Sequence, residues 1–170
     1  TYNPGAFDNA SGISALLEIA EVLNNNNIKP KKSILFIAFN GEEEGLHGSK
    51  YYVQNPIYPI DNSMLINFDC IGVNSDVPLE ISFITDNSKA LSEKFCILAD
   101  ELEIDYKETQ GGGGSDHISF DYEGVKSVMI SEMDDKYLHT INDTVENYIS
   151  EERLKQTIKF VLYYLDKNIY

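Results

Sequence analysis

The chain has 170 residues, 42% of them hydrophobic and 24% charged, which is typical of a folded globular domain and too apolar for a disordered chain. Its net charge is −15, and a surface this acidic repels phosphate backbones and anionic lipids, so the sequence argues against nucleic-acid binding and membrane docking. No apolar run approaches the roughly 18 residues that span a bilayer. We expect a single domain over residues 1–170 and leave the oligomeric state open.

In the first half of the chain, helical patterns alternate with short apolar runs. A helix is expected to begin at Ser11, with the hydroxyl as its N-cap. Its apolar positions at helical spacing are Ile13, Leu16, Leu17, Ala20 and Leu23. The continuous apolar run 34–39 predicts a strand buried on both faces, and 48–54 predicts a second helix. Two more short strands are expected at 64–68 and 79–84.

The second half of the chain repeats this alternation. One helix face is predicted by Leu91, Phe95, Leu98 and Leu102. A strand is expected at 127–130, followed by a C-terminal helix capped by Ser150, and the polar run 24–27 and the glycines 111–114 predict loops. The last helix is indicated by Leu154, Ile158, Val161, Leu162 and Leu165. Such alternation predicts an α/β fold, with helices on both faces of a mostly parallel sheet.

Several familiar catalytic motifs are missing from the sequence. No His-Glu-x-x-His pair, no Gly-x-Ser-x-Gly elbow and no phosphate-binding loop with a Gly-Lys-Ser/Thr ending occurs. Residues 115–117 contain the letters of a serine triad, but neighbours in sequence point in different directions and a triad is assembled across a fold. The two cysteines, Cys70 and Cys96, form no disulfide framework, and we expect both to be buried free thiols.

Carboxylates and a histidine follow the predicted strands. Asp8 precedes the first helix, Glu42 and Glu43 follow the run 34–39, Asp69 follows the next strand, and His139 comes after the last one. Sites in α/β folds lie beyond the carboxyl ends of strands, and zinc accepts both imidazole nitrogen and carboxylate oxygen. A chain with 28 acidic residues places some of them at loop starts by chance, so the pattern leaves a metal site and a merely solvated acidic surface both open.

Five motifs in the chain resemble those of one known family, the M28 zinc aminopeptidases. They occur in the same order as in that family, and together they are far more specific than any one alone. The motifs are GAFDNASG (5–12), EEEGLHGS (42–49), NFDCIG (67–72), SDHISFDYEG (115–124) and HTINDT (139–144).

The resemblance implies a peptidase that uses two zinc ions on an α/β fold. By position, Asp8 would bridge the two metals, Glu43 and His139 would complete one zinc, and Asp69 would serve the other. Glu42 would be the general base that takes a proton from the attacking water. The expected activity is a zinc-dependent exopeptidase, most specifically an aminopeptidase that acts on peptides.

Other residues of the motifs have less specific expectations. Asp116, His117 and Asp143 are candidates to hold a ligand in place by hydrogen bonds, and a purely structural role is the alternative for each. The spacing to the following Gly-Leu makes Glu44 a surface residue rather than part of the site.

One departure from the family pattern concerns an upstream histidine. The family supplies a zinc ligand from a His-x-Asp segment before its first motif, whereas only seven residues precede Asp8 here and none is His. We therefore expect the N-terminal part of the domain to lie outside these residues, with two zinc ions in the complete domain and one or none in this chain. A carboxypeptidase, a glutaminyl cyclase and a metal-free binding module remain alternatives, and the family suggests an exported or cell-surface location.

Overall fold

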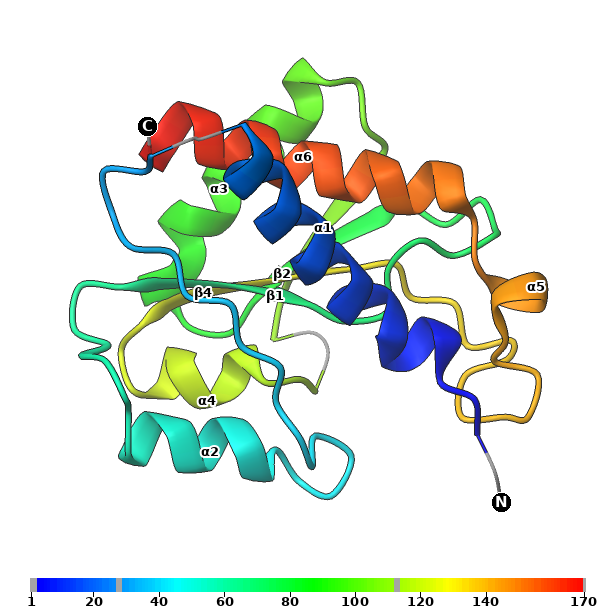
Figure 1. Cartoon of the computed structure of the whole chain (residues 1–170), viewed down its shortest axis with the longest axis horizontal. Coiled ribbons are helices and arrows are strands. Elements are labelled where there is room, and N and C mark those ends of the chain that lie inside the picture. Colours follow the sequence, from blue (N-terminus) through cyan, green and yellow to red (C-terminus); the bar gives the residue numbers. More distant parts are fainter. Residues whose placement is uncertain (1–2, 27–28, 112–113, 170) are drawn as a thin grey trace. The chain divides into compact units, whose positions relative to one another are not determined.

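Figure 1 shows the computed structural model, which describes residues 3–26, 29–111 and 114–169. The chain divides into two compact units, each built from segments that are distant in the sequence. Unit 1 consists of Thr1–Ile37, Phe68–Pro78 and Glu132–Tyr170, and unit 2 consists of Ala38–Asn67 and Leu79–Ser131. The expectation of a single domain stays a prediction.

Unit 2 contains a four-stranded sheet in the order β1-β4-β2-β3. The strands are β1 (Met64–Phe68, whose last residue is counted with unit 1), β2 (Leu79–Phe83), β3 (Tyr106–Gln110) and β4 (Lys126–Ser131). β2 pairs in parallel with β3 and antiparallel with β4, so the sheet is mixed. Every residue of β2 is buried, as its central place requires. β3 was not predicted, because its polar sequence belongs to an edge strand whose side chains are largely exposed.

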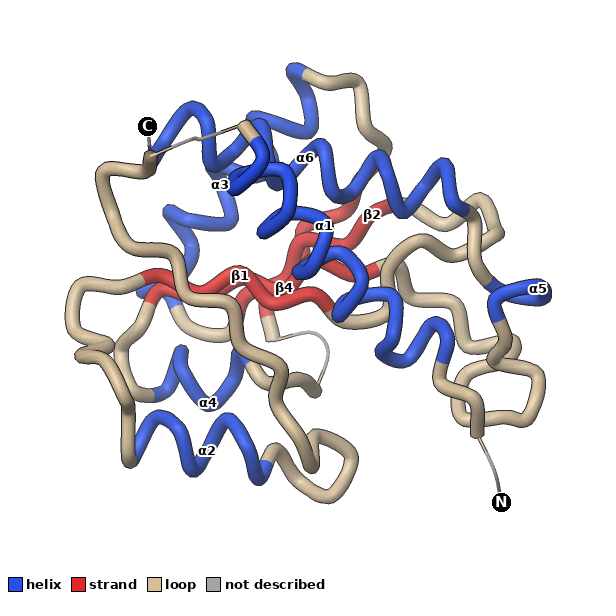
Figure 2. Tube along the Cα trace, in the orientation of Figure 1, coloured by secondary structure: helices blue, strands red, loops and turns tan. Residues whose placement is uncertain are grey.

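Helices cover both faces of this sheet, which confirms the predicted α/β class. The helices of unit 2 are α2 (His47–Gln54), α3 (Asp86–Glu101) and α4 (His117–Tyr122). α3 packs against β2 and β4 on one face, while α4 lies against β4 on the other and α2 packs on α4 (Figure 2). Of the predicted α3 positions, Leu91, Phe95 and Leu98 are buried, and Leu102 lies half-exposed just past the end of the helix.

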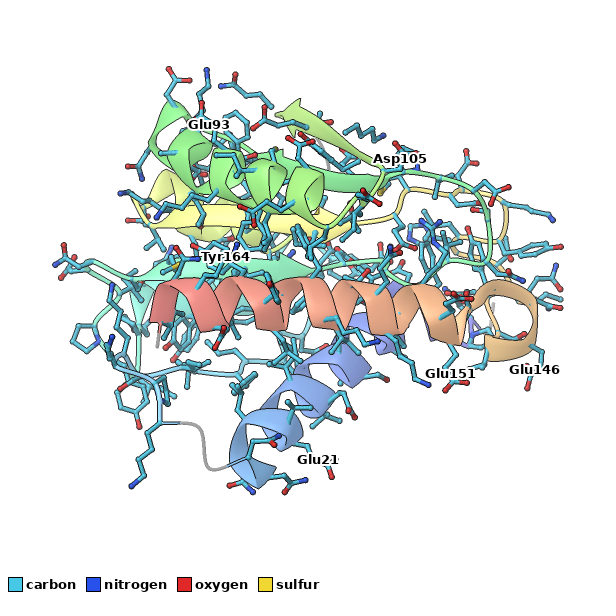
Figure 3. The ribbon with its side chains drawn as sticks, turned by 90° about the horizontal axis from the view of Figure 1, so that it is seen from above. Glu21, Glu93, Asp105, Glu146, Glu151 and Tyr164 are labelled. Carbon is cyan, nitrogen blue, oxygen red and sulfur yellow. The ribbon has the colours of Figure 1, made fainter. Side chains whose placement is uncertain are left out.

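Unit 1 is helical. Its elements are the short π-helical segment η1 (Ala6–Ala10), α1 (Ser11–Asn25), α5 (Val145–Tyr148) and α6 (Glu151–Ile169). α1 packs against α6, which carries Tyr164 on its buried face (Figure 3). The prediction of the C-terminal helix is confirmed, and the Ser150 hydroxyl accepts a hydrogen bond from the N–H of Arg153 at 3.4 Å, as a cap does.

The α1 helix was predicted correctly, but part of its predicted apolar face is wrong. The buried stripe is formed by Ala15, Ile19 and Leu23, which are spaced by four residues. Ile13 and Leu17 lie outside this stripe and are exposed, Leu17 to 68%. Apolar residues occur on two sides of this helix, so periodicity alone does not show which side is buried.

The predicted strand at 34–39 is absent: these residues form no strand, and Leu35 and Phe36 are 49% and 37% exposed. A strand exists only when a neighbour pairs with its N–H and C=O groups, and none of the four strands of the described sheet does so here. Of the two predicted loops, Asn27, Gly112 and Gly113 lie outside the described residues. No helix in the described ranges is long and apolar enough to cross a membrane.

Substitutions on the two sides of α1 test its buried stripe. We expect Ile19→Ala to lower the free energy of unfolding by about 2–4 kcal/mol, because the side chain is only 2% exposed and its removal leaves a cavity. Leu17→Ala is the matched control and is expected to change the free energy of unfolding by about 0.5 kcal/mol or less. Urea unfolding measures both, and equal losses would contradict the assignment.

Candidate metal centre

The first predicted ligands that the structure brings together are Asp8 and His139. Asp8 Oδ2 lies 2.9 Å from His139 Nε2, although 131 residues separate them in the chain. Asp8 is mostly covered, whereas the imidazole is 57% exposed and is therefore reachable from solvent. A carboxylate oxygen and an imidazole nitrogen are donors that zinc accepts.

Asp69 also lies close to the Asp8 carboxylate. One ligand atom each from Asp8, Asp69 and Cys70 fall within 4.8 Å of one another. Asp8 is therefore a neighbour of both Asp69 and His139, which is the position that a bridging carboxylate needs. These oxygen and nitrogen donors fit zinc chemistry.

Cys70 is the member of this cluster that the sequence analysis did not include. It is a buried free cysteine, as expected, and its thiol donates to Asp69 Oδ1 at 3.6 Å. Burial, and then the negative charges of Asp69 and Asp8, raise the pKa of the Cys70 thiol far above its ordinary value. The metal-free protein therefore holds a neutral thiol beside the two carboxylates. Its place directly after Asp69 was the only signal available in the sequence.

The Asn9 side chain ties the Asp8 segment to the end of β1. Asn9 Nδ2 donates to the carbonyl of Phe68 at 2.8 Å, and Asn9 Oδ1 accepts from the N–H of Gly12 at 3.0 Å. A Cβ atom at Gly12 would lie 2.8 Å from the Phe68 carbonyl oxygen, which is closer than real contacts allow. The asparagine and glycine of the DNASG sequence thus allow the backbone after Asp8 to approach the backbone of Phe68 closely. This approach places Asp8 beside Asp69.

Ser11 does not cap α1, which corrects the prediction. The N-cap position is Ala10, and no side chain caps the helix there. The Ser11 hydroxyl instead donates to the carbonyl of Phe7 at 2.7 Å and accepts from the N–H of Ile71 at 3.2 Å. This hydroxyl is a second link between the segment that carries Asp8 and the segment that carries Asp69.

Asp143 holds the Asp8 segment from the other side. Its fully buried carboxylate accepts the N–H of Phe7 at 2.7 Å and the N–H of Asp8 at 3.2 Å. Asp143 was expected to hold a ligand in place by hydrogen bonds. Its carboxylate accepts the backbone N–H groups of Phe7 and Asp8, so the HTINDT motif contributes both His139, beside the Asp8 carboxylate, and Asp143, which holds the Asp8 backbone.

A small apolar core lies under these loops. Phe7 packs on Tyr148 with ring centroids 4.5 Å apart, and Tyr137 meets Tyr148 edge-on at 5.4 Å. Cys70 and Val73 complete this buried cluster. Residues beside Asp8, Asp69 and His139 therefore share one core, which restricts independent movement of the three loops.

Glu42 and Glu43 belong to unit 2, in the turn before α2. The carbonyl of Glu42 accepts the N–H groups of Gly45 and Leu46 at 2.9 and 2.8 Å, which closes the turn. Glu42 is partly covered, and Glu43 and Glu44 are exposed. The roles assigned to these three residues stay predictions.

Asp116 and His117 lie at the start of α4, also in unit 2. His117 is fully buried, and neither ring nitrogen has a hydrogen-bond partner within the described part of the chain. Burial lowers the pKa of His117 to about 4, because the charged imidazolium is disfavoured there. Burial also raises the pKa of Asp116, against a smaller opposing effect of Ser49. His117 is thus a neutral core residue, and a ligand-holding role for either residue stays a prediction.

Comparison with known proteins identifies the class of this fold. A solved structure of a zinc aminopeptidase from Bacillus subtilis superposes with a TM-score of 0.87 at 32% identity, covering 99% of this chain and 43% of that one. A glutaminyl cyclase from Porphyromonas gingivalis shares the fold, with a TM-score of 0.73, 21% identity, and coverage of 98% and 64%. The chain therefore has the fold of zinc-dependent peptidases and related enzymes.

The family profile of peptidase family M28 matches residues 1–165, and the chain belongs to that family. This confirms the resemblance that the five motifs indicated. Among curated proteins, the chain is 33% identical over 165 residues to the aminopeptidase YwaD of Bacillus subtilis, covering 91% of this chain and 36% of that protein. The chain spans less than half of the length of these two bacterial relatives.

Weakening the contacts of Asp143 tests its hold on Asp8. In Asp143→Asn the amide group can accept only one of the two N–H bonds, so we expect zinc to bind about tenfold more weakly, as when the partners of ligating residues are lost. Asp135→Asn is the control, because this exposed aspartate lies in the same loop. Chelator competition measures both affinities. Equal affinities in the two variants would show that Asp143 does not support the site.

The buried imidazole of His117 predicts a specific loss of stability in acid. Its folded pKa of about 4 lies below the usual 6.5, so the unfolded chain binds the extra proton first. The free energy of unfolding should fall by about 3 kcal/mol as the pH drops from about 6.5 to about 4. His117→Leu should remove this part of the pH dependence, and His47→Leu, at an exposed position, should leave it. Urea unfolding across this pH range measures the free energy of unfolding of the parent and both variants. If its dependence on pH has the same slope in all three proteins, the assignment is refuted.

Proposed function

We propose that the protein is a zinc-dependent aminopeptidase that removes N-terminal residues from peptides. The observation that carries the proposal is the position of Asp8, whose carboxylate is a neighbour of both His139 and Asp69. The family membership and the names of the relatives, an aminopeptidase and a zinc aminopeptidase, support it. A carboxylate shared in this way can serve two metal ions through its two oxygens.

In this proposal, four residues hold the metal. Asp8 would be shared between two zinc ions, Glu43 and His139 would complete one site, and Asp69 would serve the other. Zinc held there would supply Lewis-acid activation of the scissile carbonyl and of a water molecule. Support for Glu43 comes from the sequence motif, whereas support for the other three residues comes from the motifs and from their positions in unit 1.

Glu42 is the proposed general base. Its carboxylate takes one proton from the attacking water and then passes this proton to the nitrogen of the leaving amine. The carboxylate is therefore restored at the end of each cycle. Glu44, two residues further along, is exposed and takes no part.

Two measurements on one preparation of the full-length protein test the proposal. Elemental analysis after dialysis with zinc should find bound zinc, and a peptide panel should show cleavage of substrates with a free N-terminus only. Cleavage of N-blocked peptides from the C-terminal end would indicate a carboxypeptidase, and cyclisation of N-terminal glutamine would indicate a glutaminyl cyclase. A protein that binds no zinc and cleaves nothing would refute the proposal and favour a binding module.

A pair of neighbouring substitutions tests the base. Glu42→Gln should keep the bound zinc but lower kcat about 10²–10⁴-fold, because the amide cannot accept the proton. Glu44→Gln is the matched control, with the same chemical change two residues away, and it should keep full activity. Zinc content and kcat are measured together for both variants. If Glu42→Gln is as active as the control, Glu42 is not the base.

A further inference from the structure

The chain contains a single arginine, Arg153, beside twelve lysines. Arg153 lies in the first turn of α6, and its guanidinium group donates hydrogen bonds to two different partners. Its Nε donates to the carboxylate of Glu132 at 3.2 Å, and its Nη2 donates to the carbonyl of Val77. A lysine has one ammonium group at the end of its chain and cannot reproduce this planar, two-directional arrangement.

Glu132 is the buried partner of this arginine. Its side chain is only 2% exposed, and one oxygen accepts the N–H of Val73 at 2.7 Å together with Arg153 Nε. The other oxygen accepts from the Thr157 hydroxyl at 3.3 Å. A buried carboxylate is stable only when charge and hydrogen bonds replace its lost water, and this one has both.

These two residues clamp the segment that follows a proposed zinc ligand. We call residues 69–78 the Asp69 segment. The N–H of Glu132 donates to the carbonyl of Cys70 at 2.7 Å, its carboxylate holds Val73, and Arg153 holds Val77. The segment is therefore held at three points: at its beginning by the backbone of Glu132, and at its middle and end by the side chains of the Glu132–Arg153 ion pair.

The beginning of the segment needs such support. Cys70 has a φ of 57°, in the left-handed region that residues with a side chain disfavour by about 1–2 kcal/mol. This turn directly follows Asp69 and therefore determines where the Asp69 carboxylate lies. The carbonyl of Cys70 is held by Glu132, and the N–H of the next residue is held by Ser11, so the turn is secured on both sides.

We propose that Glu132 and Arg153 are positioning residues for the zinc site on the Asp69 side of the centre. The inference rests on the proposed function, because it concerns the metal that Asp69 serves. Neither residue belongs to the cluster of Asp8, Asp69 and Cys70, and both act through the Asp69 segment. Loss of either residue is expected to lower the affinity for one of two zinc ions and to leave the ion on the His139 side bound.

The test uses substitutions that release the clamp in steps, made in the full-length protein, in which two zinc ions are expected. Arg153→Met removes both hydrogen bonds, Arg153→Lys retains the charge with a single donor group, and Glu132→Gln removes the negative charge. The control is Glu80→Gln in unit 2, which breaks the ion pair between this buried glutamate of β2 and the half-exposed Lys107, 2.8 Å away. Zinc stoichiometry and affinity are measured by chelator competition, below the unfolding temperature of each variant.

We expect one zinc ion to bind at least tenfold more weakly in Arg153→Met and Glu132→Gln, with a smaller loss in Arg153→Lys and none in Glu80→Gln. If the clamp variants unfold at lower temperature but bind both zinc ions like the parent, the pair only stabilises the fold and the inference is wrong. Equal weakening of both ions would also overturn it. A parent protein that binds no zinc would refute the proposed function itself and this inference with it.

Discussion

The buried carboxylate of Asp143, hydrogen-bonded to the backbone of Phe7 and Asp8, is the interaction on which the arrangement of unit 1 depends. A carboxylate without water must find strong donors, and the nearest ones are the two N–H groups just before and at the proposed bridging ligand. These two bonds join segments 135 and 136 residues apart. They bring the motif near the start of the chain to the motif that carries His139.

A second set of links joins the same Asp8 segment to the residues around Asp69. Asn9 and Ser11 supply these links with side-chain amide and hydroxyl groups, and Gly12 permits the close approach. The polar and small residues of the first motif are therefore needed for geometry as much as for chemistry. Asp8, the proposed bridging ligand, is thus held by links to two other segments of unit 1.

Helix and strand periodicity are local signals, and they predicted most of the helices and strands. The association of Asp8 with Asp69 and His139 was expected from the resemblance of the five motifs to the M28 family, and periodicity alone does not indicate it. The prediction of a strand at 34–39 was wrong, because a strand needs a neighbouring strand to pair with and periodicity does not reveal whether one is present. The prediction that Leu17 belongs to the buried face of α1 was wrong, because apolar residues lie on two faces of this helix. No sequence motif indicated the contacts of Glu132 and Arg153, because their partners are backbone atoms in a distant segment.

The separation of the linked segments has a consequence for how the protein is made. Asp8 leaves the ribosome more than 130 residues before His139 and Asp143. Contacts between such distant segments form only after most of the chain is available, and closing large loops is slow. A nascent chain that has not yet reached residue 143 lacks both the imidazole and the buried carboxylate. The candidate metal centre therefore cannot assemble before residue 143 has been synthesised.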